Sequence, residues 1–444
     1  MIKAIYYVGG FFYCFFALAI RLKYPYRRLM KFLNTKSSIS LAHVDALPIW
    51  RRPMVLLVLM SIAMPVSYST WMALLNNFVI EVAEFDGVKI GWLHGVREIP
   101  GFLAVGVIAL LLFFKEINLA ILSLVALGFA TAVTAYFPSM SGLLITTFIA
   151  SVGFHYYETA KQSLELQWIE KKKAPKILGW LVAVGSAASL CAYVLIVLGW
   201  RYWNLTYEIA YGLAGSFTIV IAIICWLAFP KFENPTKQKR QLIFRKRYWL
   251  YYALNFAAGA RRQIFIVFAA FMMVEKFGFQ VHELTALFII NYIANIIFAP
   301  LMGLFVNYYG ERTALCLEYL GLTFIFLAYG GIYYFGWGAG IAMGLYVLDH
   351  LFFALAFAQK TYFQKIADPS EIASTAAVVF TINHIPAVFL PVILGYFWIN
   401  SPAFVFVVAT LLAITSFLLA LMIPKNPNIG NETIFSKLIK NARP

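Results

Sequence analysis

Residues 160–169 read AKQSLELQWI, and residues 357–366 read FAQKTYFQKI. Three residues are identical between the two segments, and each pair is separated by 197 residues: Gln162 with Gln359, Gln167 with Gln364, and Ile169 with Ile366. The same separation relates Gly106 to Gly303 and Lys115 to Arg312. Matches that keep one separation along a chain predict two halves that arose from one ancestral unit.

The composition around these segments is that of a membrane protein. Of 444 residues, 62% are hydrophobic and only 12% are charged, with a mean hydropathy of +0.80. A soluble fold could not bury that much apolar surface, so the composition predicts an all-α polytopic membrane protein. The net charge of +16 comes mostly from Lys and Arg in loops on one predicted side. That asymmetry sets membrane orientation, and we expect no nucleic-acid partner.

Twelve apolar runs follow Arg51, each of roughly the 20 residues that cross a bilayer as helix. They lie at 53–80, 90–114, 117–136, 142–163, 177–199, 207–229, 249–273, 283–306, 314–335, 339–359, 372–397 and 402–423. The alternation of basic and uncharged loops places both ends of this twelve-helix body in the cytoplasm, in a bacterial inner (plasma) membrane.

The spans predict two pseudo-symmetric bundles of six helices each. We expect five segments: an N-terminal apolar helix with a basic stretch, the first bundle, a basic cytoplasmic linker, the second bundle and a cytoplasmic tail, at 1–50, 51–230, 231–248, 249–425 and 426–444. The apolar run at 4–20 is followed by basic residues, the reverse of a cleavable signal peptide. It either spans the membrane as a thirteenth helix or lies on its surface.

A short segment after the eighth span, GLFVNYYGER at 303–312, resembles the loop motif GxxxDxxGxR of the major facilitator superfamily, with Asn307 in place of the Asp. With twelve spans in two similar halves, the resemblance implies that superfamily's fold and transport by alternating access. It also implies that Gly303, Asn307, Gly310 and Arg312 act in gating. The equivalent loop of the first half lacks the pattern, and the fifth span lacks the proline of the antiporter motif.

Arg261 and Arg262 lie near the middle of the seventh span. A charge in hydrocarbon costs at least about 2.5–3.5 kcal/mol, so both should face a cavity or a partner. Neighbouring residues on a helix point about 100° apart, which allows one arginine to face the cavity while the other pairs with an acidic side chain. We expect at least one to bind an anionic group of the substrate. The alternative is that both are locked in salt bridges between helices.

Asp349 and His350 lie at a similar depth in the tenth span. An Asp beside an Arg can couple transport to protons, because protonation changes the strength of the pair. The alternative is a permanent structural ion pair. We also expect Glu318 to pair with Arg312 of the loop motif, one helical turn away.

Other polar residues in the spans complete the predicted site. Uncharged substrate contacts are predicted for Asn76, Gln162, Gln359 and Tyr346. Proton coupling is predicted for Glu98, His155, Glu158 and His384 beside Asp349 and His350, and gating for Arg97. The alternative for these residues is hydrogen-bonded packing between helices.

The sequence contains no HExxH, GxSxG or Walker motif, so we expect no catalysis, no cofactor and no resident metal. The residues favour a monomeric secondary active transporter that moves a small organic anion across the bilayer with proton coupling. Two alternatives remain open. One is a transition-metal exporter with His155, Glu158, Asp349, His350 and His384 as ligands. The other is a receptor or assembly factor that transports nothing.

Overall fold

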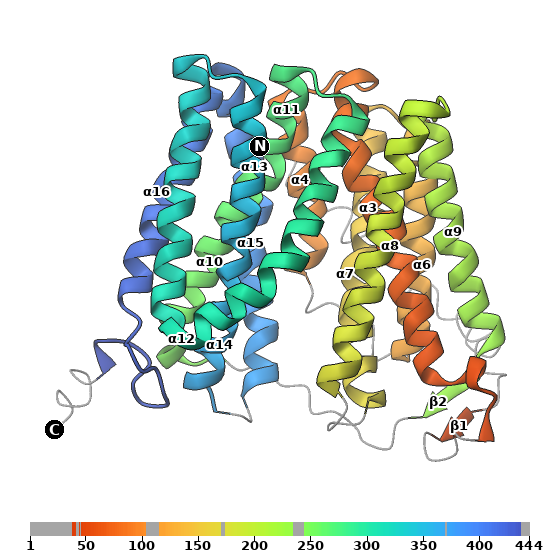
Figure 1. Ribbon diagram of the computed structural model, residues 1–444. Helices are drawn as coiled ribbons and strands as arrows, with labels where there is room; N and C mark the ends of the chain where they lie inside the picture. Colours follow the sequence, from red (N-terminus) through yellow and green to blue (C-terminus); the bar gives the residue numbers. More distant parts are fainter. Residues whose placement is uncertain are drawn as a thin grey trace, which may run out of the picture. The chain divides into compact units, whose positions relative to one another are not determined.

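The computed structural model describes residues 38–40, 44, 46–103, 115–169, 174–233, 244–368 and 371–436. These residues are almost entirely helical, as the composition predicts (Figure 1). The predicted helix at 4–20 lies outside the described residues.

Helices cover each of the twelve predicted spans as far as the structure describes them. In the N-terminal half these are α3 (Pro53–Glu81), α4 (Gly87–Phe102), α6 (Glu116–Val133), α7 (Met140–Trp168), α8 (Ala174–Tyr202) and α9 (Tyr207–Ala228). In the C-terminal half they are α10 (Trp249–Ile264), α11 (Ala270–Phe277), α12 (Val281–Phe335), α13 (Ala339–Phe353), α14 (Phe357–Ile366), α15 (Ile372–Asn400) and α16 (Pro402–Leu421). The prediction of an all-α membrane protein is therefore confirmed.

Helices α4 and α7 carry buried charged and polar side chains. Among the described residues, ten helices are long and apolar enough to cross a membrane, and α4 and α7 are not among them. These two carry the buried polar side chains Arg97, Glu98 and His155. Buried charge in a membrane protein faces a partner or a cavity rather than lipid. The buried polar side chains of α4 and α7 therefore indicate where a polar site lies.

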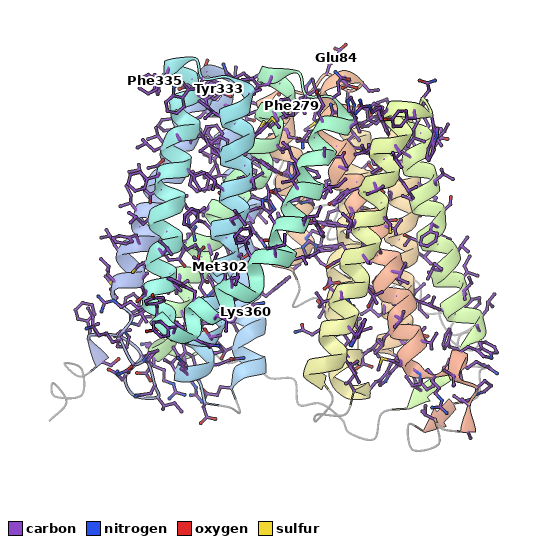
Figure 2. All side chains as sticks on the ribbon, viewed as in Figure 1. Glu84, Phe279, Met302, Tyr333, Phe335 and Lys360 are labelled. Atoms are coloured by element: carbon purple, nitrogen blue, oxygen red, sulfur yellow. The ribbon has the colours of Figure 1, made fainter. Side chains whose placement is uncertain are left out.

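The long helix α12 is two spans joined at Gly310. The backbone there is not helical, with φ 82° and ψ 165°, a conformation that favours glycine. Phe279, just before α12, and Phe335, at its end, lie toward one end of the helices, whereas Met302 lies toward the other (Figure 2). The chain therefore reverses within α12, at the loop motif that the sequence predicts between the eighth and ninth spans.

The chain divides into two compact units, Met1–Val55 with Ala228–Lys237, and Leu56–Leu227 with Gln238–Pro444. In the first unit, β1 (Ser38–Ser40) pairs in parallel with β2 (Lys231–Glu233). The sequence analysis did not predict these strands. The boundary between two bundles of six helices stays a prediction.

Close packing joins α4 to α15. Gly87, Gly91 and Gly95 share one face of α4, since residues four apart are neighbours on a helix. A Cβ atom at Gly95 would lie 2.8 Å from the carbonyl oxygen of Val388, and one at Gly91 would overlap the carbonyl oxygen of Pro391. Small residues at this spacing allow two membrane helices to bring their backbones into contact.

Glu371, just before α15, connects the segment ahead of α10 to α15. Its carboxylate accepts hydrogen bonds from Arg245 at 2.7 Å, from Arg247 at 3.0 Å and from the Tyr248 hydroxyl at 2.9 Å. Burial would raise the pKa of Glu371, but these three donors hold it below its ordinary value. The charged form of Glu371 is therefore favoured by folding.

Glu371→Gln is expected to lower the free energy of unfolding by up to about 1 kcal/mol at neutral pH, because the arginines are partly exposed. Because folding lowers the pKa of Glu371, this stabilisation is present above the unfolded value of about 4.3 and is lost as the pH falls through the folded value. Thermal unfolding in detergent at several pH values measures the difference. A difference that persists unchanged in acid would contradict a role for the charge.

Candidate functional site

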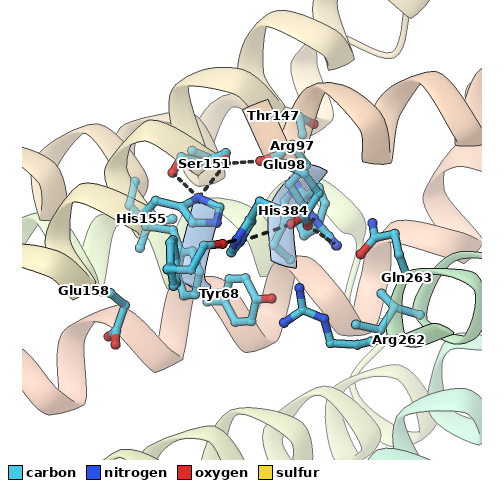
Figure 3. A pocket seen from close by; sticks show the side chains of 16 residues that line it. Tyr68, Arg97, Glu98, Thr147, Ser151, His155, Glu158, Arg262, Gln263 and His384 are labelled. Atoms are coloured by element: carbon cyan, nitrogen blue, oxygen red, sulfur yellow. Dashed lines mark hydrogen bonds and ion pairs between the residues drawn. The ribbon is translucent and has the colours of Figure 1, made fainter. Parts of the chain in front are cut away.

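A cavity of about 250 Å³ lies between α3, α4, α7, α10 and α15 (Figure 3). Its polar side chains are Tyr68, Arg97, Glu98, Thr147, Ser151, His155, Glu158, Arg262, Gln263 and His384. The sequence predicts a role in transport for six of them: Arg97, Glu98, His155, Glu158, Arg262 and His384. Helices distant in sequence therefore bring these candidates to one place.

Arg97 and Glu98 form a buried ion pair in the wall of this cavity. The Nε and Nη2 atoms of Arg97 donate to Oε1 of Glu98 at 2.9 and 2.7 Å. The guanidinium also lies 5.9 Å from the ring centre of Trp71. The second carboxylate oxygen, Oε2, lies 3.5 Å from Nε2 of His384. Arg97 thus fixes Glu98 by one oxygen and leaves the other beside a histidine.

His155 and His384 are oriented in the same way. Nδ1 of His155 lies 3.0 Å from the carbonyl oxygen of Ser151, and Nδ1 of His384 lies 2.7 Å from that of Phe380. The Ser151 hydroxyl also lies 3.0 Å from Nδ1 of His155, but it donates to the carbonyl oxygen of Arg97. A carbonyl oxygen only accepts hydrogen bonds, so this arrangement favours a proton on Nδ1 of each neutral ring. Each Nε2 then offers a lone pair. The two rings are 5.4 Å apart between centres.

A second, smaller cavity of about 100 Å³ lies between α10, α12 and α13. Its polar lining is Arg261, Arg262, Asp349 and His350. Arg262 lines both cavities. Directly after α10, residues Phe265–Ala269 form a π-helical turn, a feature often found at functional sites in membrane and soluble helices.

The two adjacent arginines have different surroundings. Arg261 is buried: its Nε donates to the Ser416 hydroxyl at 3.1 Å, and its guanidinium lies 4.5 Å from the ring centre of Tyr319. Its Nη2 lies 3.8 Å from Glu318. Arg262 is only partly buried, and no carboxylate of the described residues lies within ion-pair distance of it. Arg261 is therefore held by protein groups, whereas Arg262 faces the cavities.

The expected pairing of Glu318 with Arg312 is wrong. Glu318 is fully buried and points toward Arg261 on another helix. The sequence analysis placed it by its distance along the chain from the loop motif. A helix turns about 100° per residue, so the separation of six residues from Arg312 to Glu318 directs the two side chains to different faces.

The predicted uncharged contacts are scattered. Gln359 is buried, and its Nε2 donates to the Tyr319 hydroxyl at 2.7 Å, next to Arg261. Tyr346 lies beside the second cavity, with its ring 5.7 Å from that of His350. Asn76 is buried in α3, whereas Gln162 is exposed. The first two therefore lie near the charged residues, and Gln162 is not in either cavity lining.

Four of the five predicted gating residues lie around the reversal of α12, whereas the fifth, Arg97, lies on α4. Gly303, Asn307, Gly310 and Arg312 all lie in this helix, on either side of the turn. Asn307 is exposed and Gly310 makes the turn itself. Their arrangement agrees with a loop between two spans, and their role in gating stays a prediction.

The sequence analysis missed one constellation. Glu98, His155 and His384 each offer one ligand atom, and these atoms all lie within 4.8 Å of one another. They come from α4, α7 and α15, so no spacing along the chain could reveal them. The only available signal was that all three are polar residues in the middle of apolar spans.

Comparison with known proteins identifies related sequences and folds. A sequence model described as the Major Facilitator Superfamily matches residues 114–391. No curated protein matches the sequence.

Several solved structures share the fold. The nucleoside transporter NupG superposes with a TM-score of 0.64 at 14% identity, over 83% of this chain and 98% of that protein. A bacterial homologue of the human lysosomal transporter Spinster, inward-facing and occupied, gives 0.64 at 14% identity, over 83% and 95%. An inward-facing bacterial homologue of the iron transporter ferroportin gives 0.65 at 12% identity, over 84% and 99%. At these identities the similarity is one of fold.

Proposed function

Because this chain belongs to the major facilitator superfamily, whose members are membrane transporters, we propose that it is a secondary active transporter of a small organic anion. The transport would use alternating access and proton coupling. The observation that carries the proposal is Arg262, a guanidinium that lines both cavities and lies beyond ion-pair distance of every described carboxylate. Guanidinium donors match the geometry of carboxylate and phosphate groups.

The other two arginines of the region support this assignment by contrast. Arg97 is paired with Glu98, and Arg261 lies against Glu318, Tyr319 and Ser416. Only Arg262 among the three keeps its charge available to a solute. The prediction that one arginine faces the cavity and its neighbour pairs with an acid is therefore retained as a proposal, with Arg262 as the substrate ligand.

We assign proton coupling to the group formed by Asp349, Glu318 and Arg261. Glu318 lies 3.8 Å from the Arg261 guanidinium, Asp349 lines the same cavity as Arg261, and all three side chains are buried. With both carboxylates ionised, the group has a net negative charge away from water, which is unfavourable. A bound proton removes that charge. Arg262 follows Arg261 directly on α10, so a proton on this group can influence the substrate site.

The orientation and state of the protein are part of the same proposal. We place it as a monomer in a bacterial plasma membrane, with both ends of the twelve-helix body in the cytoplasm. The basic loops support this orientation, since cytoplasmic loops are enriched in Lys and Arg.

Arg262→Ala is expected to reduce uptake of the transported anion by about 10- to 100-fold, equivalent to the roughly 1.5–3 kcal/mol of a hydrogen bond to a charged group. Arg262→Lys should retain part of the activity, because it keeps the charge but not the paired donors. Uptake of labelled carboxylates and phosphates into proteoliposomes, with an imposed proton gradient, measures this.

Arg201→Ala is the matched control, because Arg201 is exposed at the end of α8. It should transport normally. Dissipating the proton gradient should abolish accumulation in the unmodified protein. If every anion is taken up equally by the protein and by Arg262→Ala, the proposed substrate class is wrong.

A further inference from the structure

Three potential metal ligands converge beside the larger cavity. Glu98 on α4, His155 on α7 and His384 on α15 are each at least nine-tenths buried, and one donor atom from each lies within 4.8 Å of the others (Figure 3). Burying three polar groups at one point is costly unless they are satisfied by a partner. Their meeting point therefore requires an explanation beyond packing.

The histidine tautomers are those of metal ligands. In metal sites the ligating imidazole almost always donates its other N–H to a carbonyl or carboxylate, which fixes the ring. Both rings do so here, through Nδ1, to the carbonyl four residues earlier in their own helices. Both Nε2 atoms are thereby left without a backbone partner, and Nε2 of His384 lies 3.5 Å from Oε2 of Glu98.

A glycine keeps the space between these atoms open. A Cβ atom on Gly101 would lie 2.6 Å from Nε2 of His384 and 2.7 Å from Nε2 of His155. Both nitrogens therefore lie over the same backbone position. Gly101 is three residues after Glu98, on the same side of α4, so one helix supplies both the carboxylate and the gap.

We infer that Glu98, His155 and His384 bind a divalent transition-metal ion such as Zn²⁺ or Fe²⁺. Two imidazoles and one carboxylate suit these ions, and the same donor set in catalytic zinc and iron sites leaves coordination positions open. Arg97 occupies only Oε1 of Glu98, so Oε2 is available. The adjoining cavity would accommodate a further ligand of the ion.

The charges of the cavity indicate how the ion is held. Arg97 and Arg262 offset Glu98 and Glu158 in the lining, so a divalent ion adds two positive charges. An anion bound at Arg262 would neutralise them. This coupling, unlike the metal site itself, rests on the proposed function. Ion and anion should then each strengthen the binding of the other, because such coupling is reciprocal.

The competing arrangement is a proton relay in which the two histidines and Glu98 hydrogen-bond without a metal. Titrating the purified, chelator-treated protein with Zn²⁺ by calorimetry, and with Co²⁺ by visible absorption, separates the two. We expect one ion per chain. His155→Gln and His384→Gln should each weaken binding by more than the roughly 10- to 100-fold typical of losing a second-shell partner.

Two further variants distinguish a loss of metal binding from a loss of folding. Gly101→Ala retains all three ligands but fills the gap, and it should also weaken binding. His94→Gln changes a buried histidine of α4 that lies against Trp71, and it should bind like the unmodified protein. Thermal unfolding without metal checks that each variant is folded.

Binding that survives both His155→Gln and His384→Gln, or no binding to the unmodified protein, would overturn the metal site. Neither result bears on Arg262 and anion uptake, which are measured separately in metal-free liposomes. Conversely, if Arg262→Ala does not affect anion uptake but the protein binds Zn²⁺, the anion hypothesis is wrong and the metal site is still supported.

Discussion

Arg261→Ala is expected to lower the free energy of unfolding by about 3–5 kcal/mol, the cost of removing one partner from a buried ion pair. The Arg261 side chain is 2% exposed and that of Glu318 is 0% exposed, so neither can recover its interactions from water. Asp349 lines the cavity beside them. The substitution would leave these two carboxylates buried without a positive charge.

Thermal unfolding in detergent measures this loss, and two companion variants identify its cause. Arg261→Ala combined with Glu318→Gln should recover part of the stability, because the unpaired charge of Glu318 is removed. Arg262→Ala should be nearly as stable as the unmodified protein, because Arg262 has no carboxylate partner among the described residues. If Arg261→Ala unfolds normally and only uptake falls, Arg261 acts in transport and does not stabilise the fold.

The fold was predictable because each of its signals is local in the sequence. Runs of apolar residues set the helices, and the glycine of the loop motif, Gly310, sets the reversal of α12. The repeat that pairs Gln162 with Gln359 predicts two related halves, but it does not predict the surroundings of the side chains. Gln359 is buried against Tyr319, whereas Gln162 is exposed. Similar positions in a repeat can therefore have different surroundings.

The site was predictable residue by residue, but its grouping was not. Burial cost alone marks Arg262, Glu98 and His384 as unusual in apolar spans. Which of them meet depends on how helices distant in sequence rotate and cross. That is decided by packing, such as the contact of the α4 glycines with α15. A single sequence contains no direct record of that packing, so Glu98 could not be joined to His155.

The same contact makes α4 and α15 a candidate closure of the end that is predicted to be external. The helix predicted as the second span begins at this end, where Gly91 lies against the carbonyl of Pro391 and Gly87 against Trp398. On the same side, Nδ2 of Asn77 donates to the carbonyl oxygen of Phe279 at 2.6 Å. In the proposed alternating-access transport, this contact would have to open when the site faces outward.

Gly91→Val is expected to shift the protein toward the outward-open state. A Cβ atom at residue 91 overlaps backbone rather than a flexible side chain, so the helices must separate. Overpacking of this kind costs typically about 1–3 kcal/mol in the closed state. Because about 1.4 kcal/mol changes an equilibrium tenfold, the open population should rise by roughly 5- to 150-fold.

Spin labels at Val82 and Ile399, both exposed near this end, measure the opening as a longer distance in a background without native cysteines. Gly212→Val is the matched control, because a Cβ atom there has no neighbour within 4 Å. It introduces the same side chain into a membrane helix without a clash and should leave the distance unchanged. If Gly91→Val also leaves it unchanged while the protein stays folded, α4 and α15 do not form the external closure. The gate must then lie elsewhere.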